Sequence, residues 1–168
     1  MNKDIGHFES ALYEIRAALA NNENIRKLLF YSSPDALNRE APSIDTVLKD
    51  NNLISLYPIL DEGIITSDRD AAIALDLSGL DTDFSDDDTS IYGTLVVTVL
   101  CTDKNLLLNG QKMRTLELTR EVINTLDGLK VSLSGKIEVL SEDRFINRHY
   151  YGYSIKILLT DDATGMEF

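Results

Sequence analysis

Tryptophan is missing from the 168-residue sequence, cysteine occurs once and proline only three times. The single Cys101 cannot form a disulfide within the chain, and its apolar neighbours predict a small core residue rather than a reactive thiol. No apolar run approaches the roughly 18 residues that a membrane helix needs, and the N-terminus lacks the basic and then apolar character of a signal peptide. We therefore expect a protein that is made in the cytoplasm and has no membrane contact.

Signatures of catalysis are missing as well. The glycines of the loops are isolated and build no phosphate-binding motif, and no G-x-S-x-G elbow supports a Ser/His/Asp triad. The two histidines, His7 and His149, are far apart and stand in no metal-ligand spacing with Cys101. We expect no enzymatic activity, no cofactor and no metal site.

Negative charge, in contrast, is plentiful and concentrated. The window from Asp61 to Asp103 holds eleven acidic residues and one basic residue, Arg69, so it carries −10 of the net charge of −12. A sequence pI near 4.5 argues against binding to a phosphate backbone, which needs a basic surface. An acidic surface can still face DNA if its task is to let DNA pass without sticking.

Within this window, five aspartates lie close together in the sequence: Asp81, Asp83, Asp86, Asp87 and Asp88. Oxygen ligands at such spacing suit calcium, but the EF-hand pattern fails because no Gly stands at the sixth position after Asp81 and no Glu at the twelfth. We interpret the segment as a solvated acidic loop, with adventitious calcium as the alternative.

Hydrophobic spacing predicts an α+β fold. Apolar residues at spacings of three and four between Ile5 and Leu19 predict a helix, and alternation over 71–78 predicts a half-buried strand. The β-branched run 91–101 is apolar on both faces and predicts a central strand. The other expected elements are a short helix over 25–29, a short helix through Val47 and Leu48 capped by Ser43 or Asp45, a helix over 113–126 capped by Asn109 and ending near Gly128, and strands at 137–139 and 151–159.

This order predicts a mostly antiparallel four-stranded sheet of two hairpins, with helices packed on one face, in a single domain over residues 1–168. The acidic segment then forms a hairpin loop at about 79–90, and 141–149 form the polar turn of the second hairpin. Residues 161–168 form a flexible tail.

A small basic and aromatic cluster lies near the second hairpin turn: Arg144, Arg148, His149, Tyr150, Tyr151 and Tyr153. Such a cluster can stack on nucleic acid bases, or its aromatics can pack across strands while its cations meet acidic neighbours. A third interpretation is that Arg144 and Arg148 of one copy contact the acidic loop of the next copy in a ring.

Several stretches along most of the chain carry a family resemblance. The early part has the N-terminal helix, then Leu28-Leu29-Phe30-Tyr31, Pro34-Asp35-Ala36-Leu37, Tyr57-Pro58-Ile59 and a strand entering the acidic loop. The later part has the strand 91–101, helix 111–127, Lys130-Val131, Gly135-Lys136-Ile137, Arg144-Phe145-Ile146-Asn147 and Tyr151-Gly152-Tyr153-Ser154-Ile155. With these stretches the chain resembles the neck and tail-terminator (tail-completion) proteins of tailed bacteriophages.

The resemblance implies a structural virion protein, assembled in the host cytoplasm, that forms a hexameric ring in the phage neck. Such a ring ends the tail tube and joins the tail to the head, with the tail tube protein and a neck or head-closure protein as partners. DNA would pass transiently through the lumen, and Asp81 to Asp88 would face either that lumen or a partner ring.

Two alternatives remain at this stage. A head-closure or connector protein of the same neck shares these expectations. An acidic cytoplasmic binding module, such as a nucleic-acid mimic that competes for a basic protein, also suits a pI near 4.5, although a mimic is expected to disperse its acidic charge.

Overall fold

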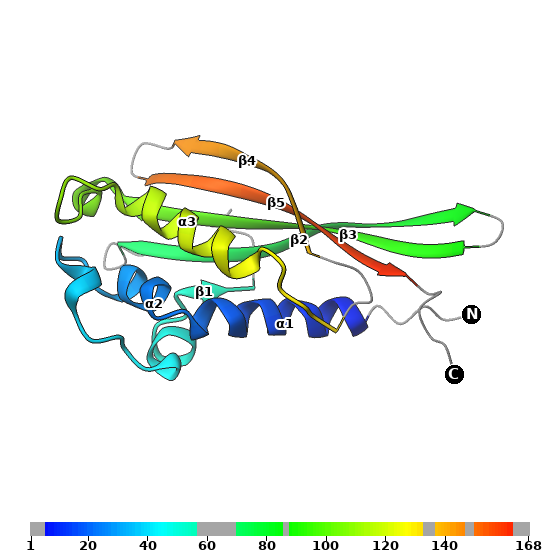
Figure 1. Ribbon diagram of the computed structural model, residues 1–168, viewed down its shortest axis with the longest axis horizontal. Helices are drawn as coiled ribbons and strands as arrows, with labels where there is room; N and C mark the ends of the chain where they lie inside the picture. The colour runs from blue at the N-terminus through cyan, green and yellow to red at the C-terminus, as the bar shows by residue number, and fades with distance from the viewer. Residues whose placement is uncertain (1–5, 57–69, 86–87, 133–136, 147–149, 163–168) are drawn as a thin grey trace.

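The computed structural model describes residues 6–56, 70–85, 88–132, 137–146 and 150–162. Its elements follow the order α1 (Gly6–Asn21), α2 (Glu23–Phe30), the 3-10 helix η1 (Ala36–Asn38), the π-helix η2 (Thr46–Asp50), β1 (Ile54–Ser55), β2 (Ala71–Ser85), β3 (Asp88–Thr102), the 3-10 helix η3 (Asp103–Asn105), α3 (Arg114–Leu126), β4 (Glu138–Ile146) and β5 (Tyr150–Asp162). Figure 1 shows these elements along the long axis of the molecule.

The strands of the described residues form one five-stranded sheet in the order β1-β2-β3-β5-β4. The hairpins β2–β3 and β4–β5 are antiparallel, and β3 pairs antiparallel with β5. This confirms the predicted α+β class and the two antiparallel hairpins. The sheet has one strand more than predicted, because the two-residue β1 adds a parallel edge beside β2.

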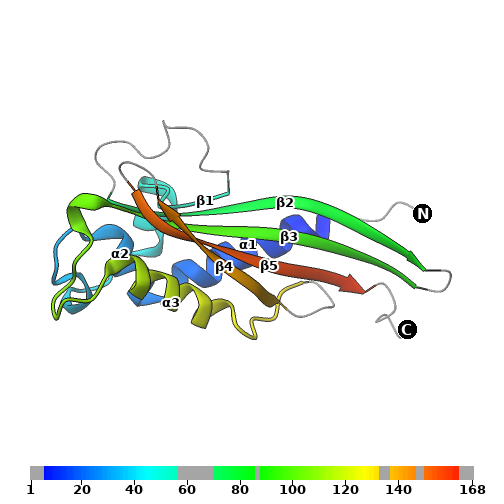
Figure 2. The same ribbon diagram turned by 90° about the horizontal axis from the view of Figure 1, so that it is seen from above.

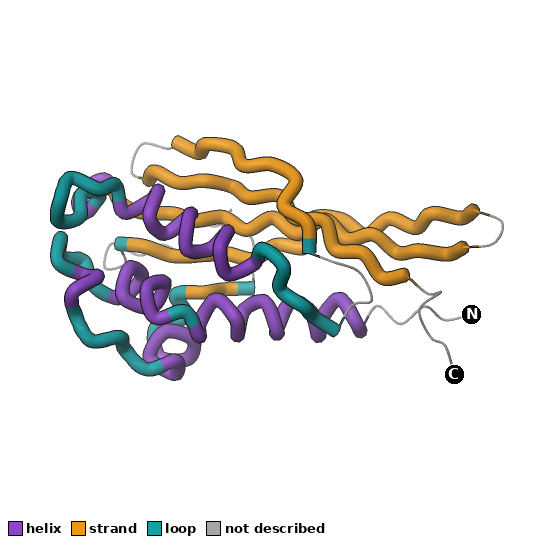
Figure 3. Tube along the Cα trace, viewed as in Figure 1, coloured by secondary structure: helices purple, strands orange, loops and turns teal. Residues whose placement is uncertain are grey.

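The helices cover one face of the sheet, as Figures 2 and 3 show. From Ile91 to Val99, alternate residues of β3 are buried while the residues between them are half-exposed, the pattern of a strand with one covered face. The covered face packs against an apolar stripe from each long helix, such as Phe8 and Ile15 of α1 and Leu118 and Val122 of α3, all fully buried. Gly93 of β3 lies under Phe8, where a Cβ atom would come within 2.7 Å of the aromatic ring.

Local signals in the sequence explain most helix ends. Asn22 caps α2, because its side-chain oxygen accepts hydrogen bonds from the backbone N–H groups of Asn24 and Ile25. Gly128, with a φ of +72°, follows the last turn of α3 as predicted. The predicted cap Asn109 is wrong: α3 begins later, at Arg114, and the backbone N–H of Asn109 donates to the Pro34 carbonyl at 2.8 Å.

Arg114 is the largest fully buried side chain among the described residues, and it joins two helices. Its guanidinium donates to the carbonyls of Leu28 at 2.8 Å, Tyr31 at 2.6 Å and Ser33 at 2.8 Å, around the C-terminal end of α2. Burial lowers the pKa of this guanidinium, while the cation meets the partial negative charge at the helix terminus. The first turn of α3 is thereby fixed to the end of α2.

Both hairpin turns are shorter than predicted. The ladder between β2 and β3 continues through the acidic segment, from Gly79 opposite Thr94 to Ser85 opposite Asp88, so the predicted loop at about 79–90 is wrong for the described residues. In the second hairpin, the predicted turn over 141–149 is likewise strand as far as Ile146, the end of β4. The predicted tail begins later as well, because β5 continues through Asp162.

Candidate functional site

The β2–β3 hairpin projects past the start of α1 as an arm, here defined as residues 81–85 and 88–92 (Figures 1 and 2). Its tip has two strands, and the end of β5 joins the arm at residues 90–92. Three of the five aspartates predicted to form an acidic loop lie on it. Asp81 pairs with Tyr92, Asp83 pairs with Ser90, and Asp88 pairs with Ser85. Asp86 and Asp87 fall outside the described residues. The acidic segment is thus held on a regular hairpin ladder rather than on a long loop.

Acidic residues from the segment predicted as a flexible tail also join the arm. In the ladder between β3 and β5, Ile91 lies opposite Asp161 and Ser90 lies opposite Asp162. Asp83, Ser90 and Asp162 therefore occupy one row across three strands. The alternation of apolar residues in β5 ends at Leu159, so the sequence pattern gave no signal that the strand continues.

Along its inner edge β2 pairs with β3, but its outer edge is paired over a short stretch. Parallel β1 contacts Ile73 and Ala74, and the Ile73 N–H donates to the Leu53 carbonyl at 2.9 Å. Beyond Ala74, none of the described residues pairs with this outer edge. Leu80, on that edge, is a large apolar side chain that is 41% exposed.

Arg144, the predicted contact residue for a neighbouring copy, lies far from the arm. It pairs with Tyr153 of β5, which is opposite Val99 of β3. The row of Asp83, Ser90 and Asp162, here called the acidic row, crosses β3 at Ser90. Nine residues of strand separate those two levels, about 30 Å at ~3.3 Å per residue. The structure therefore does not bring Arg144 and the acidic segment together within one copy. Arg148 and His149 fall outside the described residues.

Other chemistry is scarce in the described part of the chain. No group of three or more His, Cys, Asp or Glu residues is placed there to hold a metal ion. Cys101 is buried in β3, as predicted, and burial raises the pKa of its thiol to about 12. A thiol with this pKa is protonated at neutral pH and is a poor nucleophile or metal ligand.

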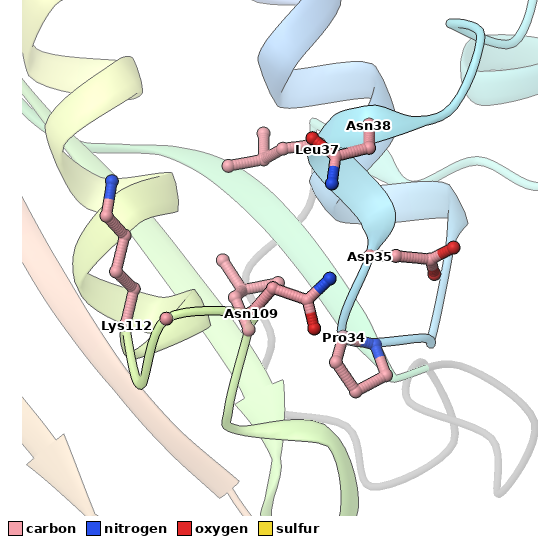
Figure 4. Close-up of a pocket in the computed structure, with 8 residues that line it drawn as sticks. Pro34, Asp35, Leu37, Asn38, Asn109 and Lys112 are labelled. Atoms are coloured by element: carbon pink, nitrogen blue, oxygen red, sulfur yellow. The ribbon is translucent and has the colours of Figure 1, made fainter.

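A surface pocket of about 340 Å³ lies near the end of the molecule opposite the arm, between residues 34–38 and 108–112 (Figure 4). The hydrogen bond from Asn109 to the Pro34 carbonyl holds the two loops together beside it. Asp35 forms an ion pair with Arg39 at 3.2 Å, and both side chains are about half exposed. The pocket brings together no catalytic or metal-ligating set, so the arm stays the stronger candidate.

Comparison with known proteins bears on this arrangement. No helix in the described residues is long and apolar enough to cross a membrane. No curated protein matches the chain. The model of the family described as YomW matches residues 22–158, a stretch that runs from the cap of α2 into β5 and includes the whole arm. This match covers most of the sequence, and the chain therefore belongs to the phage-derived YomW family.

Proposed function

We propose that the protein is a structural component of a phage neck, forming a ring that ends the tail tube and joins tail to head, with DNA passing through its lumen. Three observations support the proposal: the phage-derived family, the likeness of the sequence to neck and tail-terminator proteins, and the acidic arm. The arm is the observation that carries it, because a phage connector must contact DNA without retaining it.

Charge gives the arm a physical role in such a ring. Asp81, Asp83 and Asp88 lie on its two strands, with Asp162 on the adjoining end of β5. The described part of the arm contains no basic residue. Negative charge that faces a DNA channel repels the phosphates and keeps the duplex from adhering to the wall.

The predicted contact between Arg144 and the acidic segment of another copy sets a condition on the ring. Because Arg144 and the acidic row lie about 30 Å apart along the strands, two copies side by side at one level would not bring them together. A neighbour displaced by about that distance along the strand direction would. In a closed ring the proposed contact therefore requires the strands to run along the circumference, so that the arm of one copy reaches β4 of the next.

Deletion of the gene from the phage that encodes it tests this function. We expect heads and tails that fail to join, or tails of uncontrolled length, with rescue by the wild-type gene supplied in trans. Infectious virions of normal neck structure from the deletion phage would overturn the proposal.

Charge substitution tests the role of the arm separately. Rescue with the pair Asp81→Asn and Asp83→Asn should give joined virions that eject DNA more slowly in vitro. The matched control is the pair Glu40→Gln and Asp127→Asn, two exposed acidic residues away from the arm. Equal ejection rates for both pairs would argue against passage of DNA along the arm.

The acidic binding module is the second candidate, and one observation favours it. Both outer edges of the sheet carry net negative charge, since β2 has Asp76, Asp81 and Asp83 without a basic residue, and β4 has three acidic residues against Arg144. Sheet continuation from copy to copy is opposed by this charge. A chain that stays monomeric both alone and with the tail tube protein would support the module.

A further inference from the structure

Among the described residues, nothing pairs with the outer edge of β2 beyond Ala74. In a strand, successive residues direct their N–H and C=O groups to opposite sides, and Ile73 directs its N–H outward to β1. Residues in phase with Ile73 therefore direct theirs outward as well. After the bulge between Leu77 and Gly79, that phase falls on Leu80, Thr82 and Phe84.

These outward groups are accessible for pairing as far as the described residues go. β1 occupies the edge at Ile73 and Ala74, and no described strand follows it. An unpaired edge of this length is a template for another extended chain. The exposed Leu80 lies among the outward-directed residues and supplies an apolar contact for an added strand.

Charge decides what kind of strand fits. Along this edge lie Asp76, Asp81 and Asp83, and β2 has no basic residue. The other edge strand of the described sheet, β4, is a poor partner because it carries Glu138, Glu142 and Asp143 against the single Arg144. Like charges on facing strands destabilise pairing, whereas opposite charges stabilise it.

We propose that the outer edge of β2, from Leu75 to Ser85, binds an extended basic segment of a partner protein by strand addition. Lysine or arginine residues of that segment lie along the stretch of β2 that contains Asp76, Asp81 and Asp83, and its apolar residues contact Leu80. This goes beyond the proposed function and does not depend on it, because a single copy of the chain contains the whole edge.

A synthetic peptide of alternating lysine and valine, about ten residues long to match the ~33 Å of a strand of that length, serves as the probe. Fluorescence anisotropy with the full chain at low salt should show saturable binding that weakens as salt is added. The same peptide with N-methyl groups on alternate backbone nitrogens keeps its charges and loses the N–H donors along one edge. We expect it to bind roughly five- to tenfold more weakly, the effect of losing about one net hydrogen bond or more.

A substitution in the chain gives an independent test. In Thr82→Pro, proline removes an outward N–H and leaves the ladder to β3 intact, since proline is tolerated on a free edge. Its matched control is Thr82→Val, which keeps the N–H. We expect weaker peptide binding for Thr82→Pro alone, with circular dichroism and melting temperature close to those of the control.

Three results would overturn the proposal. Equal binding of the methylated and unmethylated peptides would show attraction by charge alone, and the absence of saturable binding at low salt would show no site. Self-association of the chain that Thr82→Pro abolishes would show that a second copy occupies the edge. Each result is readable whether or not the chain forms a ring in the phage neck.

Discussion

Replacement of Arg114 by methionine should destabilise the fold strongly, although arginine is usually a surface residue. The guanidinium satisfies the carbonyls of Leu28, Tyr31 and Ser33, and methionine fills much of its volume without a donor. The buried Leu28 carbonyl costs about 1–3 kcal/mol when it is left without a donor. The partly buried carbonyls of Tyr31 and Ser33 cost less, because water can reach them. Methionine also removes the desolvation cost of burying a cation, which offsets part of this effect. We therefore expect the free energy of unfolding to fall by about 3 kcal/mol.

Urea unfolding followed by circular dichroism measures this loss as a change in midpoint at constant slope. Arg114→Lys keeps the charge but not the forked geometry, so it should lose roughly 1–2 kcal/mol. The control is Arg39→Met, which removes a half-exposed arginine that pairs at 3.2 Å with the half-exposed Asp35. Exposed pairs of this kind contribute less than about 1 kcal/mol. A similarly small loss for Arg114→Met would refute the assigned role of the three carbonyl contacts.

Two further predictions concern the sheet. Burial raises the pKa of the Cys101 thiol from 9.0 to about 12. Because the folded state holds the thiol proton more tightly than the unfolded state, the protonated thiol contributes to the free energy of unfolding. This contribution is complete below pH 9 and is lost as the pH rises toward 12. The stability difference between wild type and Cys101→Ala, measured by urea unfolding, should shrink over that range, and a constant difference would contradict the cause. Gly152→Ala places a Cβ atom onto the Val99 carbonyl oxygen, so it should lower the free energy of unfolding by about 3 kcal/mol or prevent folding. In the control Gly79→Ala, the added Cβ atom meets no atom within 4 Å, so the variant should melt within a few degrees of wild type. Equal melting temperatures for the two variants would show that the strands move apart at no cost.

The sequence pattern predicted the parts of the sheet whose residues favour strands. Alternation over 71–78 and the β-branched run 91–101 both lie in strands as expected. The segment over 81–85 has a weaker signal, because its aspartates disfavour strands. It pairs nevertheless with residues 88–92 across the hairpin. Cross-strand pairing, which no local pattern shows, thus decides where the hairpin ends.

In helix α3, the sequence pattern predicts the buried face but not its long-range contacts. Its apolar positions were predicted, but Arg114 lies four residues before Leu118 and eight before Val122, on the buried stripe. That spacing was a signal that the arginine points into the core. Its acceptors are carbonyls near the end of α2, more than 80 residues earlier, and sequence spacing cannot identify them.

For the candidate site, the sequence located the acidic segment but not its surroundings. Asp161 and Asp162 join the arm through β5, and the free edge of β2 follows from the shortness of β1. Both depend on sheet order, which arises from contacts between distant segments. The proposed contact residue Arg144 lies at another level of the sheet, a separation that only the register reveals.

Native mass spectrometry of the chain, alone and mixed with the tail tube protein of the same phage, tests the proposed ring most directly. The spectra give the number of copies in each assembly without assumptions about shape. We expect a sixfold assembly of the 18.8 kDa chain, formed alone or on the tail tube protein. A chain that stays monomeric in both samples would contradict the ring.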